Sequence, residues 1–172
     1  SSTQESNNVI SSVNGGSYLQ TDLDIIAEIM ALGNHSAVTN EEIVNFSIQN
    51  ASHYGLETWQ DSRLQVLNVE NQSLIGYIPN SIAQLTALKE LNLNNNELIG
   101  NTDFLAELLF VEYITLDNNT FIDPIPEELC EGNVNLTAFS AENNNFCEDD
   151  MPNCINYILL GQQDCTTCPS DI

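Results

Sequence analysis

Few side chains in this sequence have the chemistry of a base, an acid catalyst or a nucleophile at neutral pH. The imidazole and amine groups are those of His35, His53 and Lys89. His35 lies inside a glycosylation acceptor and His53 in a predicted loop, and neither has a partner within a recognisable motif. The HExxH, P-loop and GxSxG motifs are absent. The sequence therefore predicts no catalytic residues and a protein that is not an enzyme.

Acidic, amide and hydroxyl side chains recur at a regular spacing in the second half of the chain. One series is Glu70, Asn94, Asp117 and Glu142, and the other is Asn68, Asn92, Thr115 and Ser140. In both series successive residues are 24, 23 and 25 positions apart. Carboxylate and amide oxygens bind Ca²⁺ and the hydroxyl groups of glycans, so Glu70, Asp117 and Glu142 are weak calcium candidates. The alternative is a solvated surface, and no other cofactor is predicted.

All five cysteines lie in the last quarter of the chain, at Cys130, Cys147, Cys154, Cys165 and Cys168. In a secreted protein this set predicts two disulfides and one remaining thiol, with a connectivity that the sequence leaves open. The C-x-x-C pair formed by Cys165 and Cys168 is an alternative redox motif, and four of the cysteines are an alternative zinc site. An odd cysteine also suggests pairing between molecules.

The acceptor motif for N-linked glycans, N-x-S/T, predicts a secreted glycoprotein. It occurs at Asn34, Asn45, Asn50, Asn71, Asn118 and Asn135. The first residues, SSTQESNN, lack the basic and apolar regions of a signal peptide, so we expect a mature secreted chain. No apolar run approaches the length of a membrane-spanning helix.

The charge balance excludes several classes of partner. The 172 residues contain 25 acidic and two basic side chains, which gives a formal net charge of -23. Binding to nucleic acid requires basic residues that neutralise phosphates, so nucleic acid is not an expected partner. Anionic membranes are disfavoured for the same reason. Hydrophobic residues make up 42%, which indicates a folded domain rather than a disordered acidic tail.

The pattern LxxLxLxxNxL occurs four times. It accounts for the regular spacing of the two polar series described above. The copies begin at Leu64, Leu88, Val111 and Leu136. Their separation lies within the roughly 20 to 29 residues of leucine-rich repeats. Each repeat buries one face only by stacking on its neighbours, so the repeats form one continuous core. The fold class is therefore an α/β solenoid, a short right-handed coil with parallel strands on a concave face that carries both polar series.

The asparagine of each repeat has a structural role in this fold. Its amide is expected to point inside and to satisfy backbone groups that the coil leaves unpaired. Asn96, Asn119 and Asn144 should thus form an interior ladder, and Gln72 takes the position in the first repeat.

Two repeats continue with a recognisable extension, LIGYIP at 74–79 and FIDPIP at 121–126. These resemble the LxGxIP segment of plant-type leucine-rich repeats, which also occur in algal and other protist secreted proteins. The second repeat, LIGNTDFL at 98–105, lacks the IP pair. The resemblance implies a second short strand in each repeat and a tryptophan, Trp59, packed on the first coil.

The sequence before the repeats predicts helices and an arm. Thr21 and Asp24 form a possible capping box before an apolar period that ends at Gly33. Thr39 and Glu42 indicate a second short helix, which we expect to run into a strand near Ile48. The predicted domains are an extended N-terminal arm at 1–20, an N-terminal helical cap at 21–63, leucine-rich repeats at 64–147 and a disulfide-stapled C-terminal cap at 148–172.

Two functions are compatible with these features. The first is a non-catalytic, secreted structural glycoprotein that self-assembles into a matrix or filament, because an arm and an odd cysteine both favour contacts between copies. The alternative is a recognition module of the inhibitor or receptor type, which binds a protein or glycan on the concave face. The expected partners are accordingly the protein itself or other extracellular proteins and glycans.

Overall fold

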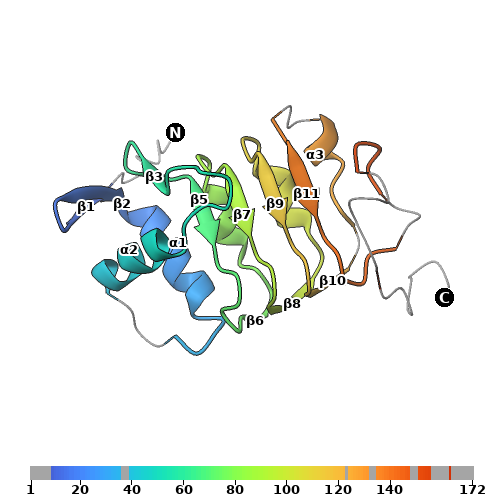
Figure 1. Cartoon of the computed structure of the whole chain (residues 1–172), viewed down its shortest axis with the longest axis horizontal. Coiled ribbons are helices and arrows are strands. Elements are labelled where there is room, and N and C mark those ends of the chain that lie inside the picture. The colour runs from blue at the N-terminus through green and yellow to red at the C-terminus, as the bar shows by residue number, and fades with distance from the viewer. Residues whose placement is uncertain are drawn as a thin grey trace, which may run out of the picture.

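The computed structural model describes residues 9–35, 39–122, 124–131, 135–147, 151–155 and 163. The repeats follow one another along the long axis of the molecule in the order of the chain (Figure 1). This is the arrangement expected of a solenoid, in which each repeat contacts its neighbours.

Four short parallel strands form the main sheet, one from each repeat. They are β5 (Val66–Asn68), β7 (Glu90–Asn92), β9 (Tyr113–Thr115) and β11 (Ala138–Ser140). The middle residues of the strands are in register and buried; they are Leu67, Leu91, Ile114 and Phe139. The repeat pattern thus places one apolar residue per strand in the core, as predicted.

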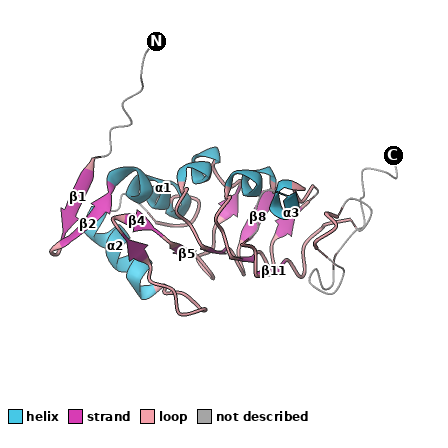
Figure 2. Cartoon of the chain, turned by 90° about the horizontal axis from the view of Figure 1, so that it is seen from above, coloured by secondary structure: helices cyan, strands magenta, loops and turns pink. Residues whose placement is uncertain are grey.

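A second parallel sheet lies along the lower edge in Figure 1. It contains β6 (Ile75–Gly76), β8 (Glu97–Gly100) and β10 (Thr120–Phe121). Strand β8 forms although its repeat lacks the IP pair. The helical segments η1 (Asn80–Gln84), η2 (Asp103–Glu107) and α3 (Glu128–Glu131) lie on the opposite side from the main sheet (Figure 2).

The interior asparagine ladder is confirmed. Asn119 donates from Nδ2 to the carbonyls of Leu93 at 2.8 Å and Leu116 at 3.1 Å, while its Oδ1 accepts from the Leu98 N–H at 3.1 Å. Asn96 and Asn144 make equivalent bonds one repeat before and after. These amides satisfy buried backbone groups between the two sheets.

The N-terminal residues differ from the predicted extended arm. Strands β1 (Ile10–Val13) and β2 (Gly16–Leu19) form an antiparallel hairpin, whereas residues 1–8 lie outside the described part of the chain. The turn consists of Asn14 and Gly15, both at positive φ, 49° and 83°. An Asn-Gly pair favours this two-residue turn, so the sequence does contain the signal. Val13 and Leu19 are buried, which attaches the hairpin to the core.

Two helices and a short hairpin connect β2 to the repeats. They are α1 (Gln20–Met30), α2 (Asn40–Gln49), β3 (Trp59–Gln60) and β4 (Arg63–Leu64). Helix α1 begins at Gln20 without a side-chain cap, so the predicted box of Thr21 and Asp24 is wrong. The box of Thr39 and Glu42 is confirmed at the start of α2. Ile48 belongs to α2 and not to a strand.

A disulfide joins Cys130 of α3 to Cys154. Cys147 is also disulfide-bonded. Cys165 and Cys168 lie outside the described residues.

Candidate functional site

The outward side chains of the main sheet form three rows across the repeats, here called the strand face. The register confirms one predicted row, Asn68, Asn92, Thr115 and Ser140. The other predicted row, here called the acidic row, consists of Glu70, Asn94, Asp117 and Glu142. Backbone hydrogen bonds such as Asn71 N–H to Asn94 O and Asn95 N–H to Asp117 O keep its members aligned from repeat to repeat. A third row, which was not predicted from the sequence, consists of Val66, Glu90, Tyr113 and Ala138. The repeat pattern LxxLxLxxNxL does contain this third row, because each of its residues directly precedes the inward residue of its strand.

The chain itself covers the first half of the strand face. The crossing loop, residues 51–58, runs from α2 to β3 and lies against β5 and β7 (Figure 1). The Ala51 carbonyl accepts from Asn68 Nδ2 at 3.0 Å. As a result Val66, Asn68, Glu90 and Asn92 are all buried. No ligand can reach these four positions while the loop is in place.

Glu90 anchors the crossing loop. Its side chain is only 1% exposed, and it accepts hydrogen bonds from the Ser52 hydroxyl and, at 3.1 Å, from the His53 N–H. Both donors belong to the loop. A buried carboxylate is costly unless it is hydrogen-bonded, so these contacts tie the loop to β7.

The crossing loop also contacts the third strand of the main sheet, β9. The ring of Tyr54 stacks on that of Tyr113, with centroids 3.9 Å apart and planes 13° apart. Burial raises the pKa of the Tyr54 hydroxyl, and the nearby Glu90, Tyr113 and Asp117 raise it further. Tyr54 remains 44% exposed, so the stack forms one border of an open surface.

The second half of the strand face, carried by β9 and β11, is open. Its outward residues are half-buried or exposed; they are Tyr113, Thr115, Asp117, Ala138, Ser140 and Glu142. Asp117 accepts through Oδ1 from the Ser140 hydroxyl at 2.6 Å and the Glu142 N–H at 2.7 Å. The buried hydroxyl oxygen of Thr115 has no hydrogen-bond partner.

The three calcium candidates do not gather into a site. Glu70 accepts from Asn92 Nδ2 at 3.2 Å and Asn95 Nδ2 at 3.1 Å, and His53 Nε2 lies 3.6 Å from it. Asn94 separates Glu70 from Asp117 in the acidic row. Within the described residues, no group of three His, Cys, Asp or Glu side chains is placed to hold a metal ion. The regular spacing therefore produces a row of separate carboxylates and not a chelating cluster.

No family profile and no curated protein sequence matches this chain. The ectodomain of the receptor kinase SOBIR1 from Arabidopsis thaliana superposes with a TM-score of 0.50 at 22% identity, over 75% of this chain and 82% of that one. The chain has the plant-type leucine-rich repeat fold.

Other leucine-rich repeat ectodomains from the same plant are also similar. The membrane receptor kinase GASSHO1/SCHENGEN3, in complex with CASPARIAN STRIP INTEGRITY FACTOR 2, shares 36% identity at a TM-score of 0.44. That match covers 48% of this chain and 10% of the receptor, so the chain spans about one tenth of the receptor's length. The BIR2 ectodomain is 19% identical over 73% of this chain and 81% of its own, with a TM-score of 0.44.

The His35 ring lies 6.2 Å from the ring of Phe46, and His53 lies beside Glu70 on the strand face. No helix of the described chain is long and apolar enough to cross a membrane.

The glycan acceptors differ in accessibility on the leucine-rich repeat scaffold. Asn34, Asn45, Asn71, Asn118 and Asn135 are exposed. Asn50 is half-buried and donates from Nδ2 to the Phe46 carbonyl at 2.9 Å, where it ends α2. Glycosylation at the exposed five stays a prediction, and the structure makes Asn50 the least suitable of the six.

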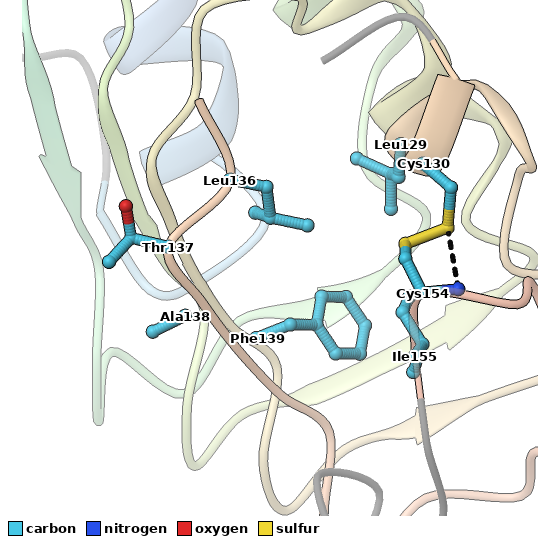
Figure 3. A pocket seen from close by; sticks show the side chains of 8 residues that line it. All are labelled: Leu129, Cys130, Leu136, Thr137, Ala138, Phe139, Cys154 and Ile155. Atoms are coloured by element: carbon cyan, nitrogen blue, oxygen red, sulfur yellow. Dashed lines mark hydrogen bonds between the residues drawn. A yellow bond between two sulfur atoms is a disulfide. The ribbon is translucent and has the colours of Figure 1, made fainter. Parts of the chain in front are cut away.

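A pocket of about 150 Å³ lies at the C-terminal end of the leucine-rich repeats (Figure 3). Its described lining is Leu129, Cys130, Leu136, Thr137, Ala138, Phe139, Cys154 and Ile155. These residues include no titratable side chain, because the two cysteines form the disulfide. Ligand pockets need a few placed polar groups for orientation, so we do not assign the functional site here.

Proposed function

We propose that this chain is an extracellular leucine-rich repeat recognition module. It binds a protein ligand by contacting basic side chains of that ligand. The ligand binds the open half of the strand face, on β9 and β11. Helices α1 and α2 close the N-terminal end of the repeats, and the disulfide between Cys130 and Cys154 fits an oxidising compartment. The proposal rests chiefly on the crossing loop, because it confines any ligand on this face to the surface beside the tyrosine stack.

The composition of this surface favours a cationic ligand. Asp117 and Glu142 extend from adjacent strands, and Tyr54 and Tyr113 border them. Aromatic faces next to carboxylates bind ammonium and guanidinium groups by cation–π and charge-assisted contacts. A net charge of -23 steers a basic ligand toward the molecule.

The same charge argues against the first function suggested by the sequence, assembly with copies of itself. The chain contains only two basic residues, and Arg63 is already paired with Asp22. Copies of this protein repel one another and have almost no cations to complement their own acidic surfaces. The hairpin of residues 10–19 also packs on its own molecule, so these residues are not a free arm.

The test is selection from a display library of random peptides, followed by measurement of the affinities of the selected peptides. We expect enrichment in Lys and Arg. Asp117→Asn should weaken the selected peptides about tenfold, because one charge-assisted contact is lost. The control is Asp61→Asn, which removes the same charge from an exposed turn far along the chain from β9.

Three results would overturn the proposal. They are enrichment without a preference for basic residues, equal losses in both variants, and binding on a glycan array in place of binding to peptides. Sedimentation of the wild-type protein completes the test, since filaments or large oligomers would restore the matrix function.

A further inference from the structure

The second sheet carries exposed apolar side chains at a repeated position. Ile75, Ile99 and Ile122 each follow a buried core residue, namely Leu74, Leu98 and Phe121. These isoleucines are 59%, 38% and 46% exposed, and the adjacent Tyr77 is 68% exposed. Of ten large hydrophobic residues exposed in the described chain, four are thus at this sheet. Such a concentration on one face indicates an interaction surface.

A groove lies within this surface. It encloses about 300 Å³ and is lined by the exposed Tyr77 and Ile99, the buried Ile78 and Phe104, and the polar Asn80, Asn101 and Asp103. Gly100 makes room for the tyrosine, because a Cβ at this position would come within 2.6 Å of the Tyr77 ring. The groove therefore has a mixed lining of apolar and polar side chains, and Asp103 adds one exposed carboxylate.

Both edges of the sheet are already paired. The Ile75 N–H donates to the Leu32 carbonyl at 3.0 Å, and Ile122 forms a bridge with Asn145 beyond β10. A partner therefore cannot add a strand here and must dock on the side chains.

The charges around the patch define the partner. Asp103 borders the groove, and the exposed Glu97 stands opposite Ile75 in the register of β6 and β8. A complementary surface is apolar with lysine or arginine beside the apolar contacts. The aliphatic part of such a side chain packs on Tyr77 and its charged end reaches Asp103. A second copy of this chain lacks these basic groups, because Lys89 is its only cation outside the Asp22–Arg63 pair.

The repeat spacing favours a helix as the docking element. Neighbouring strands are about 4.8 Å apart, and the pitch of an α-helix is about 5.4 Å. A helix that lies across the strands therefore places successive turns over β6, β8 and β10. We infer that Ile75, Tyr77, Ile99 and Ile122, with the groove at Asp103, form a docking surface for a basic amphipathic helix of another protein. This surface is separate from the strand face and does not depend on the function proposed for it.

The experiment is selection of binders from a display library of helical peptides randomised on one face. We expect apolar residues at i, i+3 or i+4 and i+7 with flanking Lys or Arg. The selected peptides should lose at least about tenfold in affinity for Ile99→Asp and for Asp103→Asn. They should bind Leu109→Asp, an exposed apolar residue away from this sheet, and Asp117→Asn like the wild type.

Selected peptides whose affinity is unchanged by both Ile99→Asp and Asp103→Asn would overturn the inference. Dimerisation of the wild type that is abolished by Ile99→Asp would also overturn it. The Ile99→Asp variant could fail to fold. The test then depends on Asp103→Asn, which should fold normally because Asp103 is exposed. Helical peptides that lose affinity for Asp117→Asn alone would also overturn the inference, because they would bind the strand face and not this sheet.

Discussion

The carboxylate of Asp22 in α1 is fully buried and is paired with Arg63 in β4. Arg63 donates from Nε to Oδ2 at 2.9 Å and from Nη2 to Oδ1 at 3.2 Å, and the Leu64 N–H donates to the same Oδ2 at 2.9 Å. One of the two basic residues of this acidic chain is thus committed to joining the helix to the first repeat. The pair connects segments that the sequence separates by 41 positions.

Asp22→Asn should destabilise the fold strongly. The variant leaves the Arg63 guanidinium without its charge partner, and breaking a buried pair in this way costs about 3 kcal/mol. In a chain of this size that loss lowers the Tm by roughly 10 °C. Thermal unfolding followed by circular dichroism measures it. The control is Asp24→Asn on the exposed side of the same helix, and an equal shift in both variants would contradict a special role for the pair.

Asn119→Ala should be among the most damaging single changes in the repeats. It removes the partner of the Leu98 N–H and of the Leu93 and Leu116 carbonyls, all in the buried interior. Unpaired buried backbone groups together cost about 3 kcal/mol or more. Chemical denaturation measures the change in unfolding free energy. Asn95→Gly, at an exposed position with φ of 57°, changes the outer part of the equivalent turn one repeat earlier and should cost far less.

The repeat frame and the ladder were predictable because every repeat must satisfy the same local requirements. The apolar positions fill the core, and the asparagine satisfies the backbone at the turn that follows each strand. The same periodicity defines the strand face, including the row of Glu90 and Tyr113, which was not predicted although the repeat contains it.

The crossing loop was not predictable in this way. Residues 51–58 have no periodicity, and their position depends on single long-range contacts such as those to Glu90. The hairpin at residues 10–19 is a different case, because the Asn14–Gly15 signal was present but outweighed by the polar composition around it.

Glu90→Gln should release the crossing loop while the repeats remain folded. The amide carries no charge to strengthen the bond from the His53 N–H, and its nitrogen cannot accept the bond that the Ser52 hydroxyl donates to the carboxylate. We expect faster hydrogen exchange of residues 51–58 and earlier proteolysis there, with little change at β9 and β11. Glu97→Gln, an exposed carboxylate on β8, is the control. Unchanged exchange in Glu90→Gln would show that other contacts hold the loop.

The free energy of unfolding should fall as pH rises above about 10, and the ionisation of Tyr54 should account for part of this fall. An unfolded tyrosine ionises near pH 10, whereas burial and the neighbouring Glu90, Tyr113 and Asp117 raise the pKa of Tyr54 in the folded protein. Above pH 10 the unfolded state therefore binds fewer protons than the folded state, and the free energy of unfolding decreases with pH. Tyr54→Phe should reduce this decrease and remove an alkaline component from the tyrosinate absorbance. An identical pH profile in the variant would contradict the assignment.

Loss of the disulfide should loosen the C-terminal end before the rest of the solenoid. The bond closes a loop with a sequence separation of 24, which in the chain-entropy description is worth about 3 kcal/mol. It also holds Ile155 against Leu129 and Phe139 around the pocket in Figure 3. In the double variant Cys130→Ser and Cys154→Ser, we expect hydrogen exchange to increase first in α3 and β11, while α1 and the first repeat keep their protection. The Asp22→Asn variant should show the reverse order, since it weakens the opposite end. If both variants lose protection evenly along the chain, the repeats unfold as one unit and the disulfide stabilises all of them equally.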